Sequence, residues 1–258
     1  MLDTAQNVFL IALWVALSVA FLFLLNRLWD PARRQIHNSV IGWQISILGT
    51  IYAVIVGFML GSVWSNYQAA ETNVDSEANA LVNLFRSADG LADAQRNAIH
   101  LSASNYAAAV LTREWPAMRR SQTANAGAPF IRDMWSILAQ APTTTSLQQA
   151  SLGQSMQELS SVTLHRRMRI LDSTSGMPNI MWALLIIGGV ITTVACCLIG
   201  TENVALHFTL IFALSLLISL ALVAIADIDR SFQGSVHVDS YAFVRARETM
   251  RSPAPVQK

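Results

Sequence analysis

Four stretches of the chain contain no charged residue, and they constrain the fold more than any other feature. They cover residues 4–26, 38–70, 173–201 and 203–226. About 20 consecutive apolar residues suffice to cross a bilayer core as a helix, and a helix satisfies its backbone polar groups internally, as lipid requires. The sequence therefore predicts four transmembrane helices. They are placed near 8–28, 43–64, 178–200 and 204–226.

The composition agrees with a membrane protein and excludes several other classes. The chain is 53% hydrophobic and only 13% charged, whereas soluble globular chains carry about 25% charged residues. A net charge of +1 offers no basic surface to a nucleic acid, so we expect no such partner. The two cysteines, Cys196 and Cys197, are adjacent in an apolar stretch and indicate no disulfide framework. The first span is too long for a signal peptide and lacks a preceding basic segment, so we expect it to be retained.

The loops between the spans group them into two hairpins. A short basic loop joins the first two spans, and a few residues around Gly200 join the last two. The sequence therefore predicts an all-α integral membrane protein, with four transmembrane helices and a helical extramembrane insert between spans two and three. Its parts are the first transmembrane hairpin (1–64), the insert (65–177), the second transmembrane hairpin (178–226) and a polar C-terminal tail (227–258).

Apolar residues in the insert recur every three or four positions, which is the period of an α-helix. Span two is predicted to continue as one helix toward Gly90, because neither glycine nor proline interrupts residues 62–89. Further helices are predicted over 92–114, 130–138 and 146–172. Pro116 is expected to end the first of these. No stretch shows a sustained alternation of apolar and polar residues with a period of two, so we predict no β-sheet.

The arginines are distributed so evenly between the two sides of the membrane that they do not determine the orientation of the chain. Loops rich in Lys and Arg tend to face the cytoplasm. Three arginines lie in the loop between spans one and two, but a larger set lies before span three and after span four. Charge alone therefore does not decide which side of the membrane the insert faces.

The second span carries a strip of small residues along one helix face. They recur every four positions and are Gly49, Ala53, Gly57, Gly61 and Ser65. Small residues let helices approach closely in lipid, so the strip predicts packing against span one or four, or against another subunit. In the second case another face of the span lines a narrow pore, and an apolar constriction can close a pore by dewetting. The pore-lining candidates are Ile51, Val54, Phe58 and Ser62.

No charged residue lies inside the four spans, which argues against a pump or a proton-coupled transporter. Charged residues instead flank the insert, as candidates for a pore mouth or a gate. They are Glu71, Asp75 and Glu77 after span two, and Arg166, Arg167 and Arg169 before span three. Carboxylates at a pore mouth favour cations, whereas arginines favour anions. Alternatively, the two groups form salt bridges with each other, or the arginines bind lipid phosphates.

The sequence carries no signature of enzyme or metal chemistry. It has no phosphate-binding glycine-rich loop and no His-Glu-x-x-His motif, and its five histidines lack metal-ligand spacing. Asp227 and Asp229 supply too few ligands for a metal, and we interpret them as a polar cap of span four. We therefore expect no enzymatic activity, no cofactor and no metal.

Two motifs carry a family resemblance. The first begins with Gly57-Phe58-Met59-Leu60-Gly61 and continues to Trp64 and Tyr67. The second, after the last span, is Asp229-Arg230-Ser231-Phe232-Gln233-Gly234. Together with two hairpins around a helical insert, these motifs resemble the bestrophin-like domain family of bacterial and plant membrane proteins over nearly the whole chain. One departure is Ser231, where the family usually has proline; the matching motif residues are Asp229, Arg230, Phe232 and Gly234.

The resemblance implies a channel. Bestrophins are pentameric chloride channels with both termini and the insert in the cytoplasm, although this chain lacks an obvious acidic calcium-binding cluster of the kind that gates them. We therefore expect an oligomeric, bestrophin-like channel of the bacterial inner membrane that passively conducts small ions, with span two lining the pore. The resemblance favours anions such as chloride, a homo-oligomer of five copies and a cytoplasmic insert. A different hypothesis is a non-conducting membrane scaffold or sensor whose helical insert binds a partner.

Overall fold

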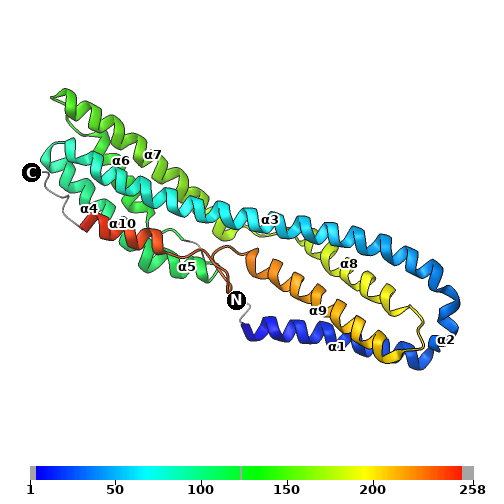
Figure 1. Cartoon of the computed structure of the whole chain (residues 1–258). Helices are drawn as coiled ribbons and strands as arrows, with labels where there is room; N and C mark the ends of the chain where they lie inside the picture. The colour runs from blue at the N-terminus through cyan, green and yellow to red at the C-terminus, as the bar shows by residue number, and fades with distance from the viewer. Residues whose placement is uncertain (1–3, 123, 252–258) are drawn as a thin grey trace, which may run out of the picture. The chain divides into compact units, whose positions relative to one another are not determined.

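The computed structural model describes residues 4–122 and 124–251, which are mostly helical and contain no strand (Figure 1). The all-α prediction is therefore confirmed. The α-helices are α1 (Thr4–Leu28), α2 (Pro31–Arg34), α3 (Asn38–Ser87), α4 (Asp93–Ala109), α5 (Trp115–Arg119), α6 (Ala128–Ala139), α7 (Ser146–Thr174), α8 (Asn179–Cys197), α9 (Val204–Ile228) and α10 (Tyr241–Arg251). Short 3-10 turns, Gln35–His37 and Ala88–Gly90, precede and follow α3, and a π-helical turn, Val110–Glu114, joins α4 to α5.

Four helices within the described residues are long and apolar enough to cross a membrane, namely α1, α3, α8 and α9. Each of them overlaps one of the four charge-free stretches of the sequence. This agreement has a simple cause, because one uninterrupted apolar stretch can satisfy its backbone in lipid only as a helix.

The helix α3 is continuous over 50 residues. At a rise of 1.5 Å per residue it is about 75 Å long, more than twice the thickness of a bilayer core. It ends at Ser87, and a 3-10 turn carries the chain on to Gly90. The prediction that span two continues as one long helix toward Gly90 is therefore confirmed.

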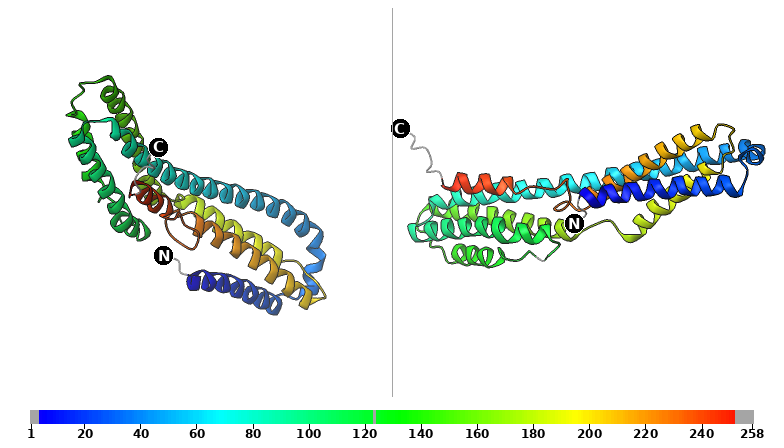
Figure 2. Two further views of the ribbon diagram at one scale, coloured as in Figure 1. Left: turned by 60° about the vertical axis from the view of Figure 1, so that its left-hand side comes forward. Right: turned by 90° about the horizontal axis from the view of Figure 1, so that it is seen from below.

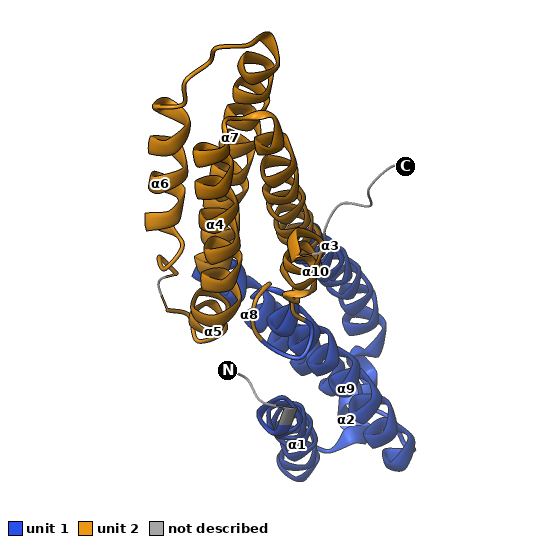
Figure 3. Ribbon diagram, turned by 90° about the vertical axis from the view of Figure 1, so that its left-hand side faces the viewer, with its two compact units in different colours: residues 1–65, 176–230, 234–236 blue, residues 66–175, 231–233, 237–258 orange. Residues whose placement is uncertain are grey.

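The chain divides into two compact units (Figure 3). Unit 1 comprises Met1–Ser65, Gly176–Arg230 and Gly234–Val236. Unit 2 comprises Asn66–Ser175, Ser231–Gln233 and His237–Lys258. The helix α3 contributes its first part to unit 1 and its remainder to unit 2.

Unit 1 is built from α1, α2, α8, α9 and the first part of α3. The helix α1 lies along α9, and α8 contacts both of them (Figure 2). Two small apolar clusters are buried between these helices, one of Leu22, Cys197 and Ile211 and one of Val63, Leu185 and Ile225. Many other apolar side chains of these helices point outward. This arrangement suits a membrane, because lipid tails are as apolar as the side chains themselves.

The loop between α1 and α3 is bonded to the turn between α8 and α9. The Asn38 side chain donates to the Gly200 carbonyl over 2.7 Å, and the Gly200 N–H donates to Asn38 Oδ1 over 2.9 Å. The buried Arg34 donates from Nη1 to the Cys197 carbonyl over 2.8 Å and from Nη2 to the Asn26 side chain. These bonds satisfy polar groups at the helix ends and hold the first loop of unit 1 in place.

Unit 2 has a hydrophobic core between α4, α5, α6, α7, α10 and the second part of α3. Its largest fully buried members are Tyr106, Phe232, Phe243, Leu81, Leu84, Ile99, Met118, Met134 and Leu138. Removing one such large apolar side chain from water contributes about 1.5–3 kcal/mol. A core of this kind stabilises a helical domain without help from lipid.

Two parts of unit 2 differ from the sequence expectation. Pro116 does not end the helix that begins at Asp93; the chain passes through the π turn into α5, whose first turn contains Pro116. Proline is tolerated there because the first N–H groups of a helix need no intrahelical partner. The C-terminal tail, which we predicted only as a polar segment, contains the helix α10, which buries Phe243, Ala246 and Met250.

Candidate pore helix and charged sites

In unit 1, Tyr52 packs the face of α3 that turns toward the other helices of the unit. Its ring lies against α8, where a Cβ at Gly188 would come within 2.7 Å of the ring and one at Gly189 within 2.9 Å of the hydroxyl. The Tyr52 hydroxyl also donates to the Leu185 carbonyl over 3.1 Å. The two glycines of α8 therefore allow α3 to approach closely, and this contact determines which face of α3 turns away from the unit.

The small-residue strip lies on the part of α3 that its own unit leaves open. A Cβ added at Gly49, Gly57 or Gly61 meets no neighbouring side chain or segment of the described residues within 4 Å. Ala53 and Ser65 are exposed. Among the described residues, the strip therefore has no packing partner within the chain.

The pore-lining candidates also lie on the open side of α3. Ile51, Val54 and Phe58 are 54%, 52% and 73% exposed, and Ser62 is exposed as well. At 100° per residue, Val54 and Phe58 lie about 160° and 120° around the helix from Tyr52, whereas Ile51 and Ser62 lie about 100° and 80° from it, on the flank of the helix. An apolar surface followed by a hydroxyl thus stands free on one side of the helix.

Unit 2 contains a fully buried arginine at its centre. Arg169 donates from Nε to Glu77 Oε2 over 2.7 Å and from Nη2 to Glu77 Oε1 over 3.1 Å. The same Nη2 donates to Glu114 Oε2 over 2.8 Å. All three side chains are completely inaccessible to solvent. Two parallel bonds from one guanidinium to one carboxylate form the strongest and most directional type of ion pair.

Further bonds complete most of this network, although Arg166 Nε is buried without a hydrogen-bond partner among the described residues. Glu114 Oε1 accepts from Arg166 Nη2 over 2.7 Å and from the Gly127 N–H over 2.7 Å. The Tyr106 hydroxyl donates to Glu77. Two carboxylates and two guanidinium groups balance each other, so the buried charge network (Glu77, Tyr106, Glu114, Arg166 and Arg169) has no net charge.

The network shifts the ionisation of its members. Burial alone raises the pKa of Glu114, but the charge and hydrogen bond of Arg169, with the Gly127 N–H and Arg166, outweigh it and hold this pKa below its ordinary value. Burial raises the pKa of Tyr106 well above its usual range, and the neighbouring Glu77 charge adds to this effect. At neutral pH these shifts keep Glu114 ionised and Tyr106 protonated.

The local sequence explains how Glu114 reaches the core. It follows Val110 by four residues on the buried face that begins with Ile99, and both residues belong to the π turn. Such π turns are rare and occur frequently at functional sites. We did not select Glu114 or Tyr106 from the sequence. The available signal was a carboxylate on an apolar helix face, which requires a buried partner.

The six charged candidates of the sequence therefore separate into two groups. Glu77, Arg166 and Arg169 belong to the buried network, so for them the salt-bridge alternative describes the observed contacts. Glu71, Asp75 and Arg167 are exposed and form no ion pair among the described residues. A gating role stays a prediction for both groups.

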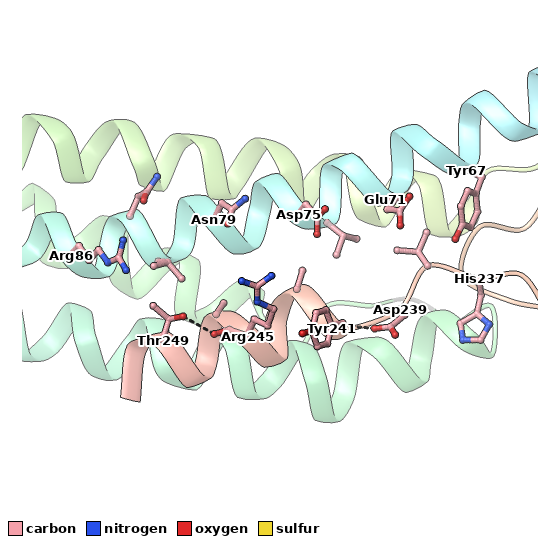
Figure 4. A pocket seen from close by; sticks show the side chains of 16 residues that line it. Tyr67, Glu71, Asp75, Asn79, Arg86, His237, Asp239, Tyr241, Arg245 and Thr249 are labelled. Atoms are coloured by element: carbon pink, nitrogen blue, oxygen red, sulfur yellow. Dashed lines mark hydrogen bonds between the residues drawn. The ribbon is translucent and has the colours of Figure 1, made fainter. Parts of the chain in front are cut away.

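A groove runs along unit 2 between α3 and the segment that contains α10 (Figure 4). It has a volume of about 600 Å³. From α3 it is lined by Glu71, Asp75 and other polar side chains, and from the C-terminal segment by Asp239, Tyr241 and Arg245. The Arg245 guanidinium lies 5.8 Å from the centre of the Tyr241 ring.

The sequence matches the model of the Bestrophin-like domain over residues 12–243. The chain belongs to the bestrophin-like family. The resemblance found in the sequence is therefore confirmed. The family and the apolar helices make the chain a membrane protein with a channel-type fold. No curated protein matches the sequence.

Solved structures agree with this assignment. Two crystal structures of a bacterial bestrophin homologue from Klebsiella pneumoniae, each with one substitution, are 11% and 14% identical to the chain, with TM-scores of 0.66 and 0.61. The first covers 95% of this chain and 97% of its own, the second 96% and 100%. A crystal structure of a membrane protein is 13% identical, with a TM-score of 0.62, and covers 95% and 97%. At these identities the likeness shows the fold alone.

The bestrophin-like motif after α9 forms a capped turn. In unit 1, Asp229 accepts from the Met177 N–H over 2.8 Å, and Asp227 accepts from the backbone N–H groups of Ser235 and Val236. Gly234 has a φ of +80° and packs so closely on Asp227 that a Cβ would lie 2.4 Å from its oxygen. This turn requires glycine for both reasons.

Two other positions of the motif lie in different surroundings. In unit 2, Phe232 is buried with its ring edge-on to Trp115, at 5.7 Å and 74°. Arg230 is exposed. At Ser231, where the family usually has proline, the carbonyl accepts from the Val238 N–H over 2.8 Å. This bond uses the main-chain carbonyl, which serine and proline both have.

Proposed function

We propose that this chain is one subunit of a homo-oligomeric ion channel, with α3 lining a central pore. The observation that supports this most directly is the open side of α3. A bestrophin-like helix about 75 Å long exposes a small-residue strip and an apolar row, and neither has a packing partner among the described residues of its own chain. A second copy offers the strip a close-packed partner, which lipid does not.

The strip and the apolar row have different tasks in this proposal. Glycine and alanine let two helix backbones approach and gain dispersion contacts, so Gly57 and Gly61 pack against the adjacent subunit. Val54 and Phe58 then surround the axis as a narrow apolar ring. Such a ring stops ions by excluding water, and it opens when it widens.

The charges favour passive conduction. The membrane-spanning part of α3 carries no Asp, Glu, His, Lys or Arg, so it lacks the charged side chains that usually form a relay for coupled transport. We further propose, from the bestrophin-like family, that the conducted ions are anions such as chloride, that the ring has five copies, and that the insert faces the cytoplasm of a bacterial inner membrane. Glu71 and Asp75 act against an anion preference if they lie at the pore mouth.

Flux through liposomes tests this proposal. The purified protein, with its oligomeric state verified by native mass spectrometry, is reconstituted into vesicles that contain a chloride-sensitive dye. We expect chloride entry above that of empty vesicles, and we expect Phe58→Ala to increase it several-fold because the apolar ring becomes wider. Phe23→Ala is the matched control, since Phe23 is an exposed phenylalanine on α1. Verified oligomers that conduct neither chloride nor potassium would refute the proposal.

The scaffold or sensor hypothesis is supported by unit 2, which has its own core and a polar groove of about 600 Å³. It predicts a monomer or dimer, because a central pore needs several copies of α3. Native mass spectrometry of the detergent-extracted protein therefore distinguishes the two functions. Cysteine labelling at Ser121, after replacement of both native cysteines, determines the side that the insert faces.

A further inference from the structure

An apolar pocket opens on the surface of unit 1, between α1, α8 and α9. It has a volume of about 240 Å³, which is smaller than the roughly 300–1,000 Å³ of pockets that hold a drug-sized ligand. Its described lining residues come from these three helices and none from α3, and all are apolar or aromatic except Ser219. The Ser219 hydroxyl donates to the Leu216 carbonyl over 2.9 Å. The pocket therefore suits a hydrocarbon chain rather than a polar molecule.

The shape of the pocket fits one such chain. Leu10 and Leu17 of α1 line it seven residues apart, which corresponds to about 10 Å along the helix. This length lies within one leaflet, since the whole hydrocarbon core is about 30 Å thick. A helix with its side chains is about 10–12 Å wide, so a neighbouring helix is too large to enter. Leu10, Leu17 and Ile186 are exposed, and the pocket is therefore open to the surrounding lipid.

Each of the three helices carries a polar residue just beyond the apolar wall, at the end of unit 1 where α1 and α8 begin and α9 ends (Figure 1). Asn7 on α1 and Asn179 on α8 each precede a lining residue by three positions. Arg230 follows the lining residue Ala226 by four, and the intervening Asp229 keeps helical dihedral angles. Residues three or four apart share a helix face, so Asn7, Asn179 and Arg230 form a polar mouth at one end of the pocket.

Two groups of this polar mouth lack partners among the described residues. Asn7 Oδ1 is buried and accepts no hydrogen bond there, and Arg230 is exposed without an ion pair. The nearest acidic residues along the chain, Asp227 and Asp229, accept from backbone N–H groups instead. A phospholipid offers the complementary groups, namely a phosphate for the guanidinium and a hydroxyl or ammonium donor for the amide oxygen.

We propose that this pocket holds one acyl chain of a glycerophospholipid, whose phosphate binds Arg230 and whose headgroup donates to Asn7. An apolar wall that ends in a polar mouth follows the order of groups in such a lipid. The mouth also lies at the ends of the membrane-spanning helices, where arginines meet the lipid headgroups. The inference goes beyond the proposed channel and needs only a single chain.

The bound chain supports a contact of the proposed pore helix. A Cβ added at Gly189 would lie 3.2 Å from the Trp14 ring and 2.9 Å from the Tyr52 hydroxyl. Trp14 lines the pocket, and Tyr52 belongs to α3. A side chain that faces an empty space loses its dispersion contacts on that side, so removal of the lipid should loosen the packing of Trp14 beside Tyr52. The fluorescence of Trp14 therefore reports on the site.

Native mass spectrometry of the full-length protein tests the site. The protein is reconstituted into vesicles of phosphatidylethanolamine and phosphatidylglycerol and then extracted in detergent, and we expect one phospholipid per chain to stay bound. Ala226→Phe fills the pocket beside its mouth and should abolish this retention, whereas Ala224→Phe, at an exposed position of α9 outside the pocket, should not. Arg230→Gln should lower the retention by about fivefold, and Arg33→Gln, at an exposed position of α2, should leave it unchanged.

Fluorescence quenching gives a second test that needs no filled pocket. The protein in detergent is titrated with brominated phosphatidylglycerol, and the contribution of Trp14 is obtained by comparison with Trp14→Phe. We expect this contribution to be quenched with saturation near one lipid per chain, because the brominated chain lies against the indole ring. Addition of unbrominated phosphatidylglycerol should restore the fluorescence.

The outcomes separate this inference from the proposed function. A retained phospholipid that A226F removes and A224F keeps supports the site. Equal loss in both variants, retention of detergent or fatty acid alone, or quenching of Trp14 that does not saturate overturns it. Because the pocket belongs to one chain, a monomer that keeps its lipid refutes the channel and leaves the site standing, whereas conducting oligomers without this lipid do the reverse.

Discussion

Replacing Arg169 by methionine tests whether the buried charge network stabilises unit 2. The substitution preserves length and apolar volume but removes the two bonds to Glu77 and the bond to Glu114. Glu114 retains Arg166 and the Gly127 N–H. Glu77, which is completely buried, loses the cation with which it pairs among the described residues. The variant therefore contains a buried carboxylate without a counter-charge.

The expected loss follows from this uncompensated charge. Removing one partner of a buried ion pair costs about 3–5 kcal/mol, a large part of the roughly 5–15 kcal/mol by which proteins are stable. In a protein of this size, 1 kcal/mol lowers the unfolding midpoint by about 2–4 °C. We therefore expect R169M to unfold about 6–20 °C below the unsubstituted protein.

Thermal unfolding in detergent, followed by tryptophan fluorescence, measures this shift. Trp115 reports on the network directly, because its ring centre lies 5.8 Å from the Arg169 guanidinium. Arg132→Met is the matched control, since Arg132 is exposed on α6 and forms no ion pair among the described residues. It should change the midpoint by no more than about 2 °C.

A second variant separates lost charge balance from lost packing. In E77Q/R169M the uncompensated carboxylate is gone, so part of the lost stability should return, and the interaction energy follows from the double-mutant cycle. A midpoint for R169M within about 2 °C of the unsubstituted protein, or an E77Q/R169M variant less stable than R169M, would refute the reasoning.

Three further predictions follow from other contacts. The pKa of Glu114 in the folded protein lies below its ordinary value of 4.5, so its ionisation contributes stability that is lost as the pH falls below 4.5. We expect the thermal unfolding midpoint to decrease in acid for this reason. An E114Q variant with the same acid dependence would contradict this. Gly57→Val should leave the folded monomer intact, because a Cβ at this position meets no other segment of the described residues within 4 Å. The substitution should nevertheless weaken the oligomer in native mass spectra; unchanged oligomers would remove the strip from the subunit contact. Gly234→Ala should cost about 1–2 kcal/mol from its positive φ alone and more from the clash with Asp227, seen as a lower midpoint than for Gly153→Ala, an exposed helical glycine with free space.

The sequence predicts the helices well, because their signals are local. Charge-free stretches identify α1, α3, α8 and α9, and the spacing of apolar residues identifies most of the insert. The same logic misses α10, because it is charged on one face and a short amphipathic helix within a tail gives a weak signal. It also misjudges Pro116, since a proline that ends one helix and one that begins the next have the same local sequence.

The pairing of charges could be predicted only as an alternative. Glu77 and Arg169 are 92 residues apart, and periodicity does not state which distant residues meet. A row of small residues indicates a helix face that packs closely against another helix, but it does not show whether that helix belongs to the same chain or to another subunit. The structure decides these cases differently: it gives Arg169 its partners, and it shows that Gly57 and Gly61 have none within the chain's described residues.

The charge-free membrane-spanning helices have a consequence for the electrical behaviour of the protein. A transmembrane voltage acts on a protein by moving charge through the field, and each elementary charge that crosses contributes about 2.3 kcal/mol per 100 mV. Residues 38–70 and the other three charge-free stretches contain no charge that could move, and the buried network of unit 2 is neutral as a whole. Opening of such a channel transfers little gating charge. For the proposed channel, the current should therefore rise in proportion to the applied potential, and the open probability should depend little on that potential.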